Sequence, residues 1–478
     1  MVAYGEFRAP YDNDKTDTRF VFYGIRYIIE NYLSKPWTVQ DVENAEKFYS
    51  THGAGNTPYP YPRDLFLKFV KENNGWFPVK IQALPEGTVC NVRVPVYQIT
   101  AKKEYAKLVT FLETVLTHLW YPSTVATLSR RTKDIITDGY TATVDEDMWW
   151  TLDGRLHDFG FRGCTSVEQS VIGGSAHLLN WAGSDTMSAA YYAQFYLNGG
   201  RPVCQSIPAT EHSVMTAWET EAKAIKNMIQ RFGGENKVFA CVMDSYDYEK
   251  ALNETLPIIY KETEGKWGLM VLRPDSGDPV ESVLMALRAG EKVGGVAVNK
   301  KGFKVLKGFA VIQGDGINYT SLRRIVDAVV KEGYSLCSVA FGMGAGLLQK
   351  LNRDTMSFAT KLSHIEYADG KKRDIMKMPK TDRTKISHPG ILKVKKVNDV
   401  PTVFPSTEDD ADPENLLRVV WDNGPVKDLK WDDFDTLKAR VNKEWSLVPK
   451  LADPVSKELK DKIADWIKEF EIKFQVNK

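Results

Sequence analysis

The chain has 478 residues, of which 26% are charged, and its formal net charge is only +1. A near-neutral balance excludes general binding to nucleic acid or to a membrane surface, so an anion site must come from local clustering of charge. No apolar run reaches the roughly 18 residues of a membrane span, and the first residues lack the pattern of a signal peptide. The five cysteines are odd in number and widely spaced, which favours reduced thiols in a cytoplasmic protein.

The two ends of the chain both combine strand-like and helical patterns. Short strand-like runs and a helix near Val21–Leu33 occupy residues 1–112, and the runs are Val79–Ala83, Thr88–Val92 and Val94–Ile99. Beyond Lys361 the chain is basic, then acidic, and it closes with an amphipathic pattern from Leu459 to Phe470. We predict that residues 1–112 and 352–478 form one split α+β domain, with residues 113–351 inserted between its halves.

The middle of the chain repeats one pattern five times. Short apolar runs, each followed by polar or glycine residues, recur about thirty to forty residues apart, the length of one strand, loop and helix. The runs are Val203–Ile207, Val238–Met243, Gly268–Leu272, Phe309–Ile312 and Ser338–Phe341. Helix signals lie between them, including an expected helix over 213–232, an N-cap at Asp278 before Pro279, and apolar spacing from Leu322 to Val330. We predict an irregular α/β barrel-like domain over 113–351.

Chemically capable side chains follow these predicted strands. His212 and Asp244 each come just after an apolar run, and Arg273 and Asp275 follow the next run across a rigid proline. Ligands of parallel α/β folds bind at the carboxyl ends of the strands, so we expect these four residues to share a site for an anion. The plain alternatives are a structural histidine and an ion pair that caps a helix.

Two glycine-rich loops follow the last two predicted strands. Gly314 and Asp315 lie in the first loop, and Gly344 and Ala345 lie in the second, ahead of an expected helix at Leu347–Leu351. Exposed backbone N–H groups in such loops bind phosphate oxygens, and the last strand ends of a barrel often form the phosphate site. One such loop is weak evidence, whereas two in succession favour a phosphate cradle.

The segment from His157 to Gly163 (HDFGFRG) places an imidazole, a carboxylate, an aromatic ring and a guanidinium in one stretch. Phe159 is suited to stack on a flat ring, and Arg162 to bind a phosphate through two hydrogen bonds. The alternative is a solvent loop with an incidental salt bridge. Taken together, the residues predict a sugar phosphate or diphosphate held beside an aromatic ring.

Several motifs in this order resemble the nicotinamide phosphoribosyltransferase family. They are HDFGFRG at 157–163, PATEHS at 208–213, DSYD at 244–247, RPDSG at 273–277, QGDG at 313–316 and FGMGAGLLQKLNRD at 341–354. The resemblance implies a type II phosphoribosyltransferase fold. It also implies a reaction of NAD salvage, in which nicotinamide and 5-phosphoribosyl 1-diphosphate give nicotinamide mononucleotide and diphosphate.

The resemblance also implies roles for individual residues. Phe159 is expected to stack on the pyridine ring, Asp185 to bind the carboxamide N–H₂, and His212 to be phosphorylated when ATP hydrolysis is coupled to the reaction. The residues implied at the ribose and diphosphate are Arg162, Asp244, Arg273 and Asp275, and those implied at the 5′-phosphate are Gly314, Asp315, Gly344 and Ala345. Mg²⁺ bound with phosphoribosyl diphosphate and ATP as a co-substrate are the implied cofactors.

A homodimer with shared active sites is the implied assembly. Arg8, Arg353 and Lys361 match basic residues that reach the neighbouring subunit's site. The chain departs from the family pattern in three places: Met1 lies downstream of a family segment that supplies a second stacking tyrosine, Ala345 replaces a glycine, and the basic loop after Lys361 keeps only Lys377 and Lys385. Two alternatives therefore stay open, namely a nicotinate-using enzyme, against which Asp185 argues by charge repulsion, and an inactive dimeric homologue.

Overall fold

The computed structural model describes residues 1–379 and 385–474, which form two compact units. The first unit comprises residues 1–127, 352–432 and 436–478, and the second comprises residues 128–351 with 433–435. Helix α5 (Trp120–Thr143) contains the first border, which the sequence analysis placed at 112/113. Among the described residues, no helix combines the length and apolar character that crossing a membrane requires.

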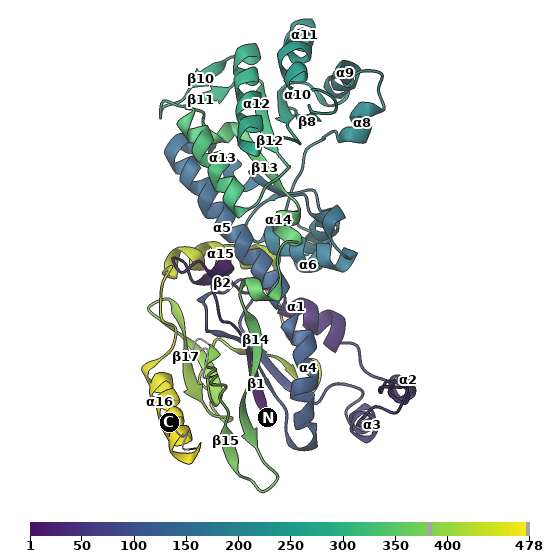
Figure 1. The fold of residues 1–478 in the computed structure, drawn as a ribbon, viewed down its shortest axis with the longest axis vertical. Helices are drawn as coiled ribbons and strands as arrows, with labels where there is room; N and C mark the ends of the chain where they lie inside the picture. The colour runs from purple at the N-terminus through teal and green to yellow at the C-terminus, as the bar shows by residue number, and fades with distance from the viewer. Residues whose placement is uncertain (380–384, 475–478) are drawn as a thin grey trace. The chain divides into compact units, whose positions relative to one another are not determined.

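An antiparallel sheet of six strands forms the centre of the first unit (Figure 1). In spatial order its strands are β15 (Lys372–Asp374), β14 (Phe358–Glu366), β1 (Val2–Phe7), β5 (Pro95–Thr100), β3 (Lys80–Ala83) and β18 (Arg418–Asp422). The amino-terminal strand is therefore an inner strand, bonded to β5 on one side and to β14 on the other. Two ribbons accompany the sheet, β2 (Arg19–Val21) with β4 (Val89–Asn91) and β16 (Ile391–Val397) with β17 (Val400–Ser406).

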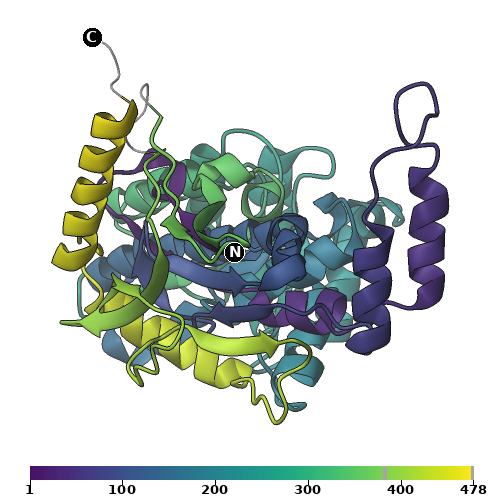
Figure 2. The same cartoon turned by 90° about the horizontal axis from the view of Figure 1, so that it is seen from below.

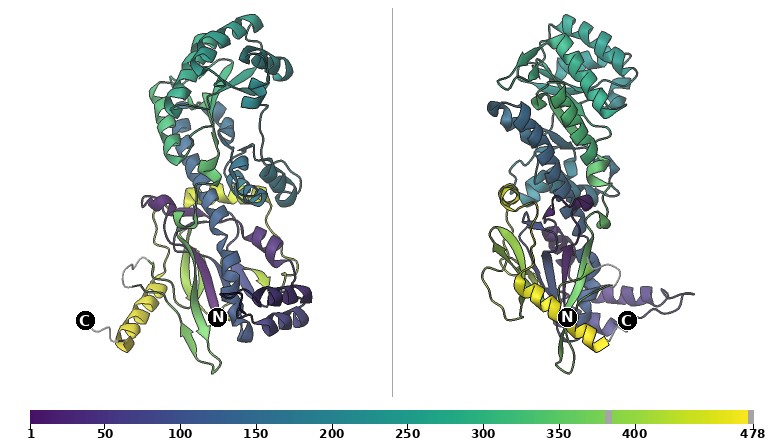
Figure 3. Two further views of the ribbon diagram at one scale, coloured as in Figure 1. Left: turned by 45° about the vertical axis from the view of Figure 1, so that its right-hand side comes forward. Right: turned by 60° about the vertical axis from the view of Figure 1, so that its left-hand side comes forward.

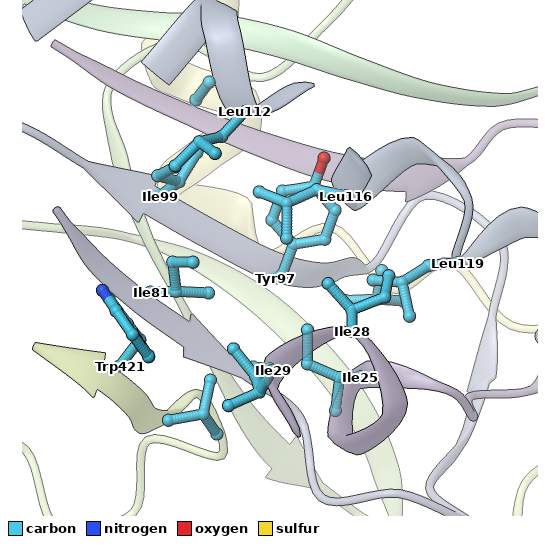
Figure 4. Close-up of a cluster of buried hydrophobic side chains, with 14 of the residues drawn as sticks. Ile25, Ile28, Ile29, Ile81, Tyr97, Ile99, Leu112, Leu116, Leu119 and Trp421 are labelled. Carbon is cyan, nitrogen blue, oxygen red and sulfur yellow. The ribbon is translucent and has the colours of Figure 1, made fainter. Parts of the chain in front are cut away.

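Apolar side chains from the sheet and its helices form the core of the first unit. Figure 4 shows Ile81 and Ile99 of the sheet together with Leu112 and Leu116 of α4 (Leu108–Thr117), all of them buried. The predicted helix near Val21–Leu33 is broken up, because Val21 ends strand β2 and the helical part is only α1 (Ile25–Ile28) and the π-helical turn η2 (Ile29–Leu33). These two turns add Ile25, Ile28 and Ile29 to the same core.

Four further helices lie wholly or mainly in the first unit. Helices α2 (Val39–Tyr49) and α3 (Arg63–Glu72) lie side by side as a hairpin (Figure 2). The expected amphipathic helix at the end of the chain is α16 (Lys457–Phe474), which packs against the β16–β17 ribbon through Leu459 (Figure 3). Helix α15 (Phe434–Leu447) precedes it and begins in the short piece 433–435 that belongs to the second unit.

A curled parallel sheet forms the second unit. Its strands are, in spatial order, β7 (Gly183–Ser184), β6 (Leu156–Asp158), β13 (Val339–Met343), β12 (Phe309–Gln313), β9 (Leu269–Arg273) and β8 (Val238–Val242). Four of these strands were predicted within a residue or two, which confirms the strand–loop–helix repeat. Helices α12 (Pro279–Gly294) and α13 (Tyr319–Lys331) pack against each other in this unit (Figure 1).

The fifth predicted strand, Val203–Ile207, is not a regular strand. Its segment makes one bridge at each edge of the curled sheet, from Gln205 to Gly183 and from Ala209 to Ala240. Pro202 and Pro208 flank the run, and proline has no backbone N–H to extend a ladder. Single bridges therefore close the sheet into an irregular barrel, which is the predicted fold class.

The helices after the strands differ from the prediction in two places. The expected helix over 213–232 is divided into α8 (His212–Thr216) and α9 (Glu221–Phe232), because the Thr220 side chain accepts from Lys223 N and starts a new helix. The helix expected at Leu347–Leu351 is the short α14 (Ala345–Leu348). The predicted cap at Asp278 is confirmed, since its carboxylate accepts from the backbone of Val280 and Glu281.

The second unit has further α-helical and π-helical segments. They are α6 (Val167–Leu178), α7 (Met187–Tyr192) with the π-helical turn η6 (Ala193–Leu197), α10 (Tyr248–Lys250), η7 (Ala251–Thr255) and α11 (Leu256–Thr263). The inward face of the strands is lined by small and branched apolar residues, among them Ala240, Val271 and Ala310. These short side chains leave room for a ring at the end of the barrel.

Candidate active site

Phe159 enters the barrel mouth from the end of β6. Its backbone N–H donates to Met343 O at 3.0 Å, and the buried carboxylate of Asp158 accepts from Gly160 N at 2.7 Å, so the loop is held on both sides. Burial raises the pKa of Asp158 to about 7. A Cβ atom at Gly342 would lie 2.0 Å from Cε2 of Phe159, and one at Gly314 would lie 2.9 Å from it. The two glycines are therefore required for the ring to lie where it does.

Arg273 connects this ring to an acidic residue. Its Nη2 donates to both carboxylate oxygens of Asp275 at 3.0 Å, and its Cζ lies 5.3 Å from the centre of the Phe159 ring. The side chains of Arg273 and Asp275 are 15% and 12% exposed, so the pair keeps most of its strength against screening by water. The guanidinium is positioned to bind an anionic group beside a flat ring.

His212 lies between two carboxylates. Its Nε2 is 3.0 Å from Oδ1 of Asp244, and its Nδ1 is 3.8 Å from Oδ2 of Asp275. The imidazole is 44% exposed, whereas the two carboxylates are nearly buried. The four residues that were predicted to share a site for an anion are thus brought together from three successive loops, with the His212 imidazole open to a ligand.

A cavity of about 320 Å³ adjoins this group. Its lining residues are His157, Phe159, Phe161, Arg162, Asp185, Ser206, Ile207, Ala209, Thr210, Glu211, Ala240, Arg273 and Ile312. The volume lies at the lower end of the range for small-molecule sites. Four residues proposed from the sequence share this wall, namely Phe159, Arg162, Asp185 and Arg273.

Asp185 has two partners that the sequence analysis did not assign. The Ser206 hydroxyl donates to Oδ1 of Asp185, and Nδ1 of His157 lies 3.4 Å from its Oδ2. His157 was noted within its motif, and Ser206 lies in the apolar run Val203–Ile207. These two residues and Asp185 come from β6, from that run and from the loop after β7, and no spacing in the sequence relates the three. The aspartate side chain is 41% exposed and faces the cavity.

The two glycine loops lie at the ends of β12 and β13. Gly314 lies close to both Phe159 and Arg273, and Asp315 O accepts from the Gln313 side chain at 2.8 Å. Gly344 caps the short helix α14, in which Ala345 is the first residue. A Cβ atom at Gly344 would lie 3.4 Å from Phe159 O, which is ordinary contact, so this glycine is not required by packing alone.

The three remaining basic residues, Arg8, Arg353 and Lys361, belong to the first unit. Arg8 follows strand β1 and donates through Nε to Ser357 O at 3.1 Å, and Lys361 lies on the adjacent strand β14. Burial, together with the nearby charges of Arg8 and Lys377, lowers the pKa of Lys361. Arg353 is exposed, and its guanidinium lies 3.7 Å from Asp354.

The carboxylates of the site suit a divalent cation that arrives with phosphate. Among the described residues, no group of three or more His, Cys, Asp or Glu side chains has the arrangement of a dedicated metal site. Mg²⁺ commonly binds through one or two carboxylates together with substrate phosphates. Asp244 and Asp275 offer such oxygens beside Arg273, so the donor set fits Mg²⁺ that is carried by a diphosphate.

A curled parallel sheet with glycine loops and an arginine–aspartate pair at its strand ends is the fold of a type II phosphoribosyltransferase. The model of the nicotinate phosphoribosyltransferase (NAPRTase) family matches residues 154–425. A nicotinamide phosphoribosyltransferase of Xanthomonas campestris is 38% identical over 417 residues, which are 85% of this chain and 87% of that protein. The chain therefore belongs to the nicotinate phosphoribosyltransferase family.

Other relatives extend this picture. A nicotinamide phosphoribosyltransferase of Acinetobacter baylyi is 29% identical over 444 residues, covering 86% of each chain. Two solved structures share the fold at low identity. The human nicotinic acid phosphoribosyltransferase has a TM-score of 0.59, with 15% identity over 98% of this chain and 95% of that one. The nicotinate-nucleotide pyrophosphorylase of Pyrococcus furiosus has a TM-score of 0.58, with 16% identity over 94% and 90%.

Proposed function

We propose that this chain transfers the phosphoribosyl group of 5-phosphoribosyl 1-diphosphate to nicotinamide, giving nicotinamide mononucleotide and diphosphate in NAD salvage. The choice of nicotinamide over nicotinate as the substrate rests on the pair formed by Asp185 and the Ser206 hydroxyl on the cavity wall. A carboxylate can accept from the N–H₂ of a carboxamide, whereas it repels the carboxylate of nicotinate. The names of the two bacterial relatives agree with this choice.

The residues of the site divide the work of the reaction. Phe159 supplies a face on which the pyridine ring stacks, which holds the ring nitrogen in line with the ribose. Arg273 and Arg162 stabilise the negative charge that develops on the departing diphosphate. Mg²⁺ held with the diphosphate, near Asp244 and Asp275, would add positive charge to the leaving group. No general base is required, because the pyridine nitrogen carries no proton.

The 5′-phosphate is assigned to the two glycine loops. Gly314 and Asp315 follow β12, and Gly344 and Ala345 follow β13, at the end of the sheet where phosphate sites of barrels usually lie. The methyl group of Ala345 leaves its N–H in place, so the replacement of a glycine there does not remove a donor.

His212 is the proposed site of transient phosphorylation by ATP. The imidazole is open on one side, and Asp244 accepts from Nε2 on the other, which favours the positive charge that a phosphorylated ring acquires. Energy from ATP would then be coupled to product formation through the same loop that faces the diphosphate.

A homodimer with shared active sites is the proposed assembly. Helix α7 and turn η6 present the exposed rings of Tyr191, Phe195 and Tyr196. The rings of Tyr191 and Phe195 are 4.7 Å apart, and the half-buried Tyr192 lies 5.6 Å from Tyr196. Such patches mark protein–protein surfaces. We propose that a second copy of the chain covers this patch and that its Arg8, Arg353 and Lys361 complete the active site. The five free cysteines are consistent with work in the cytoplasm.

The decisive experiment measures mononucleotide formation from phosphoribosyl diphosphate and Mg²⁺, with nicotinamide and nicotinate in parallel. We expect product from nicotinamide and at least tenfold less from nicotinate. The variant Asp185→Asn should raise the use of nicotinate relative to nicotinamide, and unchanged selectivity would contradict the role of Asp185. Equal use of both substrates by the unaltered chain would favour the nicotinate-using alternative.

A separate experiment tests whether two copies of the chain share their active sites. The variants His212→Ala and Arg353→Ala remove residues that the proposal places on different copies of one site. In the presence of ATP, each variant alone should be much slower than the unaltered chain, and mixing the two after gentle dissociation should restore part of the ATP-stimulated rate. Full independence of the two defects, with no restoration on mixing, would mean that each chain forms its own site.

A further inference from the structure

The side chain of Gln349 joins the loop after β6 to the loop after β13. Its Nε2 donates to Gly160 O at 3.1 Å and to Sγ of Cys164 at 3.2 Å. These two partners flank the short turn η5 (Phe161–Gly163), which contains Arg162. Because Gln349 comes directly after α14, one side chain links the turn of Arg162 to the second glycine loop.

The carbonyl group of Gly160 is the centre of this link. Its oxygen accepts from Gly163 N at 3.0 Å as well as from the side chain of Gln349. The carboxylate of Asp158 holds Gly160 from the other side, through the bond to its backbone N–H. Phe159 lies between these two anchored residues, so a shift of Gly160 displaces the backbone that carries the ring.

The packing around α14 leaves little room for the two loops to move separately. A Cβ atom at Gly160 would lie 2.6 Å from Cδ1 of Leu348, and one at Gly163 would lie 2.7 Å from Oε1 of Gln349. A second glutamine, Gln169 of α6, donates to Leu348 O at 3.2 Å, and α6 packs against α14 (Figure 1). A change in the position of α14 is therefore passed on to the loop after β6.

Packing alone does not explain a glutamine at position 349. Its Oε1 atom is buried and accepts no hydrogen bond from the described residues, which is unfavourable for an amide oxygen. An apolar side chain of similar length would fill the same space without that cost. The feature that an apolar side chain cannot supply is the bond from Nε2 to Gly160.

We propose that Gln349 is a positioning residue through which a phosphate at the second glycine loop strengthens the binding of nicotinamide. This inference rests on the proposed function, which assigns the 5′-phosphate in part to the loop of Gly344. A phosphate bound there restrains the backbone before α14, and Gln349 extends the restraint to Gly160. The pocket of Phe159 and Arg162 is then ordered before the pyridine ring arrives, so nicotinamide binds without the cost of ordering it.

The test measures the binding of nicotinamide by calorimetry, in the full chain with and without saturating ribose 5-phosphate. This probe carries the 5′-phosphate but no diphosphate, so no transfer takes place. In the unaltered chain we expect nicotinamide to bind about fivefold more tightly, or better, when ribose 5-phosphate is present. The reciprocal titration should give the same factor, because the coupling between two bound ligands is mutual.

The variant Gln349→Met removes the bond to Gly160 but keeps a side chain of similar length beside Gly163. The ratio of the two nicotinamide affinities should fall to about one in this variant, and its thermal midpoint shows whether it is folded. The matched control is Gln230→Met on α9, which makes the same change at an exposed position and should keep the ratio of the unaltered chain. A residue with only a structural role would lower both affinities together and leave their ratio unchanged.

The variant Gly163→Ala tests the same link without changing the glutamine. Its Cβ atom would lie 2.7 Å from Oε1 of Gln349, so the flexible amide must move away from Gly160. We expect this variant to lose the coupling as well, and to lose nothing more when it is combined with Gln349→Met. It decides the question if Gln349→Met fails to fold.

Two outcomes overturn the inference. One is an affinity for nicotinamide that ribose 5-phosphate leaves unchanged in the unaltered chain, and the other is a coupling that persists in Gln349→Met and Gly163→Ala. Formation of mononucleotide by the unaltered chain separates this failure from that of the proposed function. Product without coupling overturns only the inference, whereas absence of both product and nicotinamide binding overturns the proposed function as well.

Discussion

The Nε2 atom of His212 and the Oδ1 atom of Asp244 lie 3.0 Å apart, although one begins a helix and the other follows the next strand. The carboxylate is only 5% exposed, so it is held by the fold and not by solvent. A carboxylate can only accept, so this partner fixes Nε2 as the ring nitrogen that donates to it. The pair therefore links the proposed phosphorylation of His212 to a buried, immobile group.

The first prediction concerns ATP. The variant His212→Asn should lose stimulation by ATP. A slower, ATP-independent transfer of the phosphoribosyl group should remain, because Arg273 still contacts the leaving diphosphate. The ratio of initial rates with and without ATP measures this directly. The control His118→Asn changes an exposed histidine of the first unit and should keep the stimulation. Stimulation that survives in His212→Asn would exclude this histidine as the phosphorylated residue.

The second prediction tests the packing of Phe159. The variant Gly342→Ala places a methyl group within 2.0 Å of the ring edge, so the ring must move out of its position. We expect kcat/KM for nicotinamide to fall by about tenfold or more, which corresponds to the loss of a stacking contact. The double variant with Phe159→Ala should be no worse than Phe159→Ala alone, since the methyl group then meets no ring. Additive losses would show that Gly342 acts in another way.

The third prediction concerns the guanidinium of Arg273. The variant Arg273→Lys keeps the charge but loses the fork that contacts both oxygens of Asp275 and lies over Phe159. The KM for phosphoribosyl diphosphate should rise by about tenfold, which corresponds to about 1.4 kcal/mol of binding. Steady-state kinetics at saturating nicotinamide measure it, with the exposed Arg231→Lys as the control. An unchanged KM would remove Arg273 from the diphosphate site.

The fourth prediction concerns stability and pH. Glu6 is fully buried in strand β1, its oxygens accept no hydrogen bond from the described residues, and Arg93 lies 3.6 Å away. Burial raises its pKa from 4.5 to about 7. The folded protein therefore binds a proton that the unfolded chain releases, so the free energy of unfolding falls as pH rises from about 4.5 to about 7 and is constant above. The lost stability is at most about 3 kcal/mol.

The variant Glu6→Gln cannot ionise and should not show this loss. Its thermal midpoint should gain on that of the unaltered chain as the pH rises from 5.5 to 8, whereas the exposed Glu43→Gln should follow the unaltered chain throughout. Parallel curves for all three proteins would mean that Glu6 keeps its ordinary pKa through contact with solvent.

Local patterns predicted the repeat of the second unit well. The strands around Val271 and Val311, the cap at Asp278 and the helix from Tyr319 each depend on neighbours within a few residues of sequence. The run at Val203–Ile207 was wrong as a regular strand, because its partners, Gly183 and Ala240, are set by closure of the barrel and not by its own apolar character.

The residues of the site also differ in how far the local sequence predicts them. His212, Asp244, Arg273 and Asp275 were recognisable because each comes just after a predicted apolar run, and the structure brings them together. The triplet of His157, Asp185 and Ser206 was not recognisable as a unit, because its members come from three segments whose register depends on the curled sheet. Motif resemblance marked Asp185, but only the distances reveal its partners.

The strand order of the first unit has a consequence for synthesis. Strand β1 is made before the other strands of its sheet, yet its neighbour β14 ends at Glu366, and β18, the neighbour of β3, ends at Asp422. By then all of residues 128–351 have been made, so the curled barrel can close before the sheet of the first unit is complete. Strand β5 is made soon after β1 and can pair with both β1 and β3, but the edges of β1 and β3 that later bind β14 and β18 stay open until those strands are made. These two open edges are where the nascent chain is exposed to pairing with another chain.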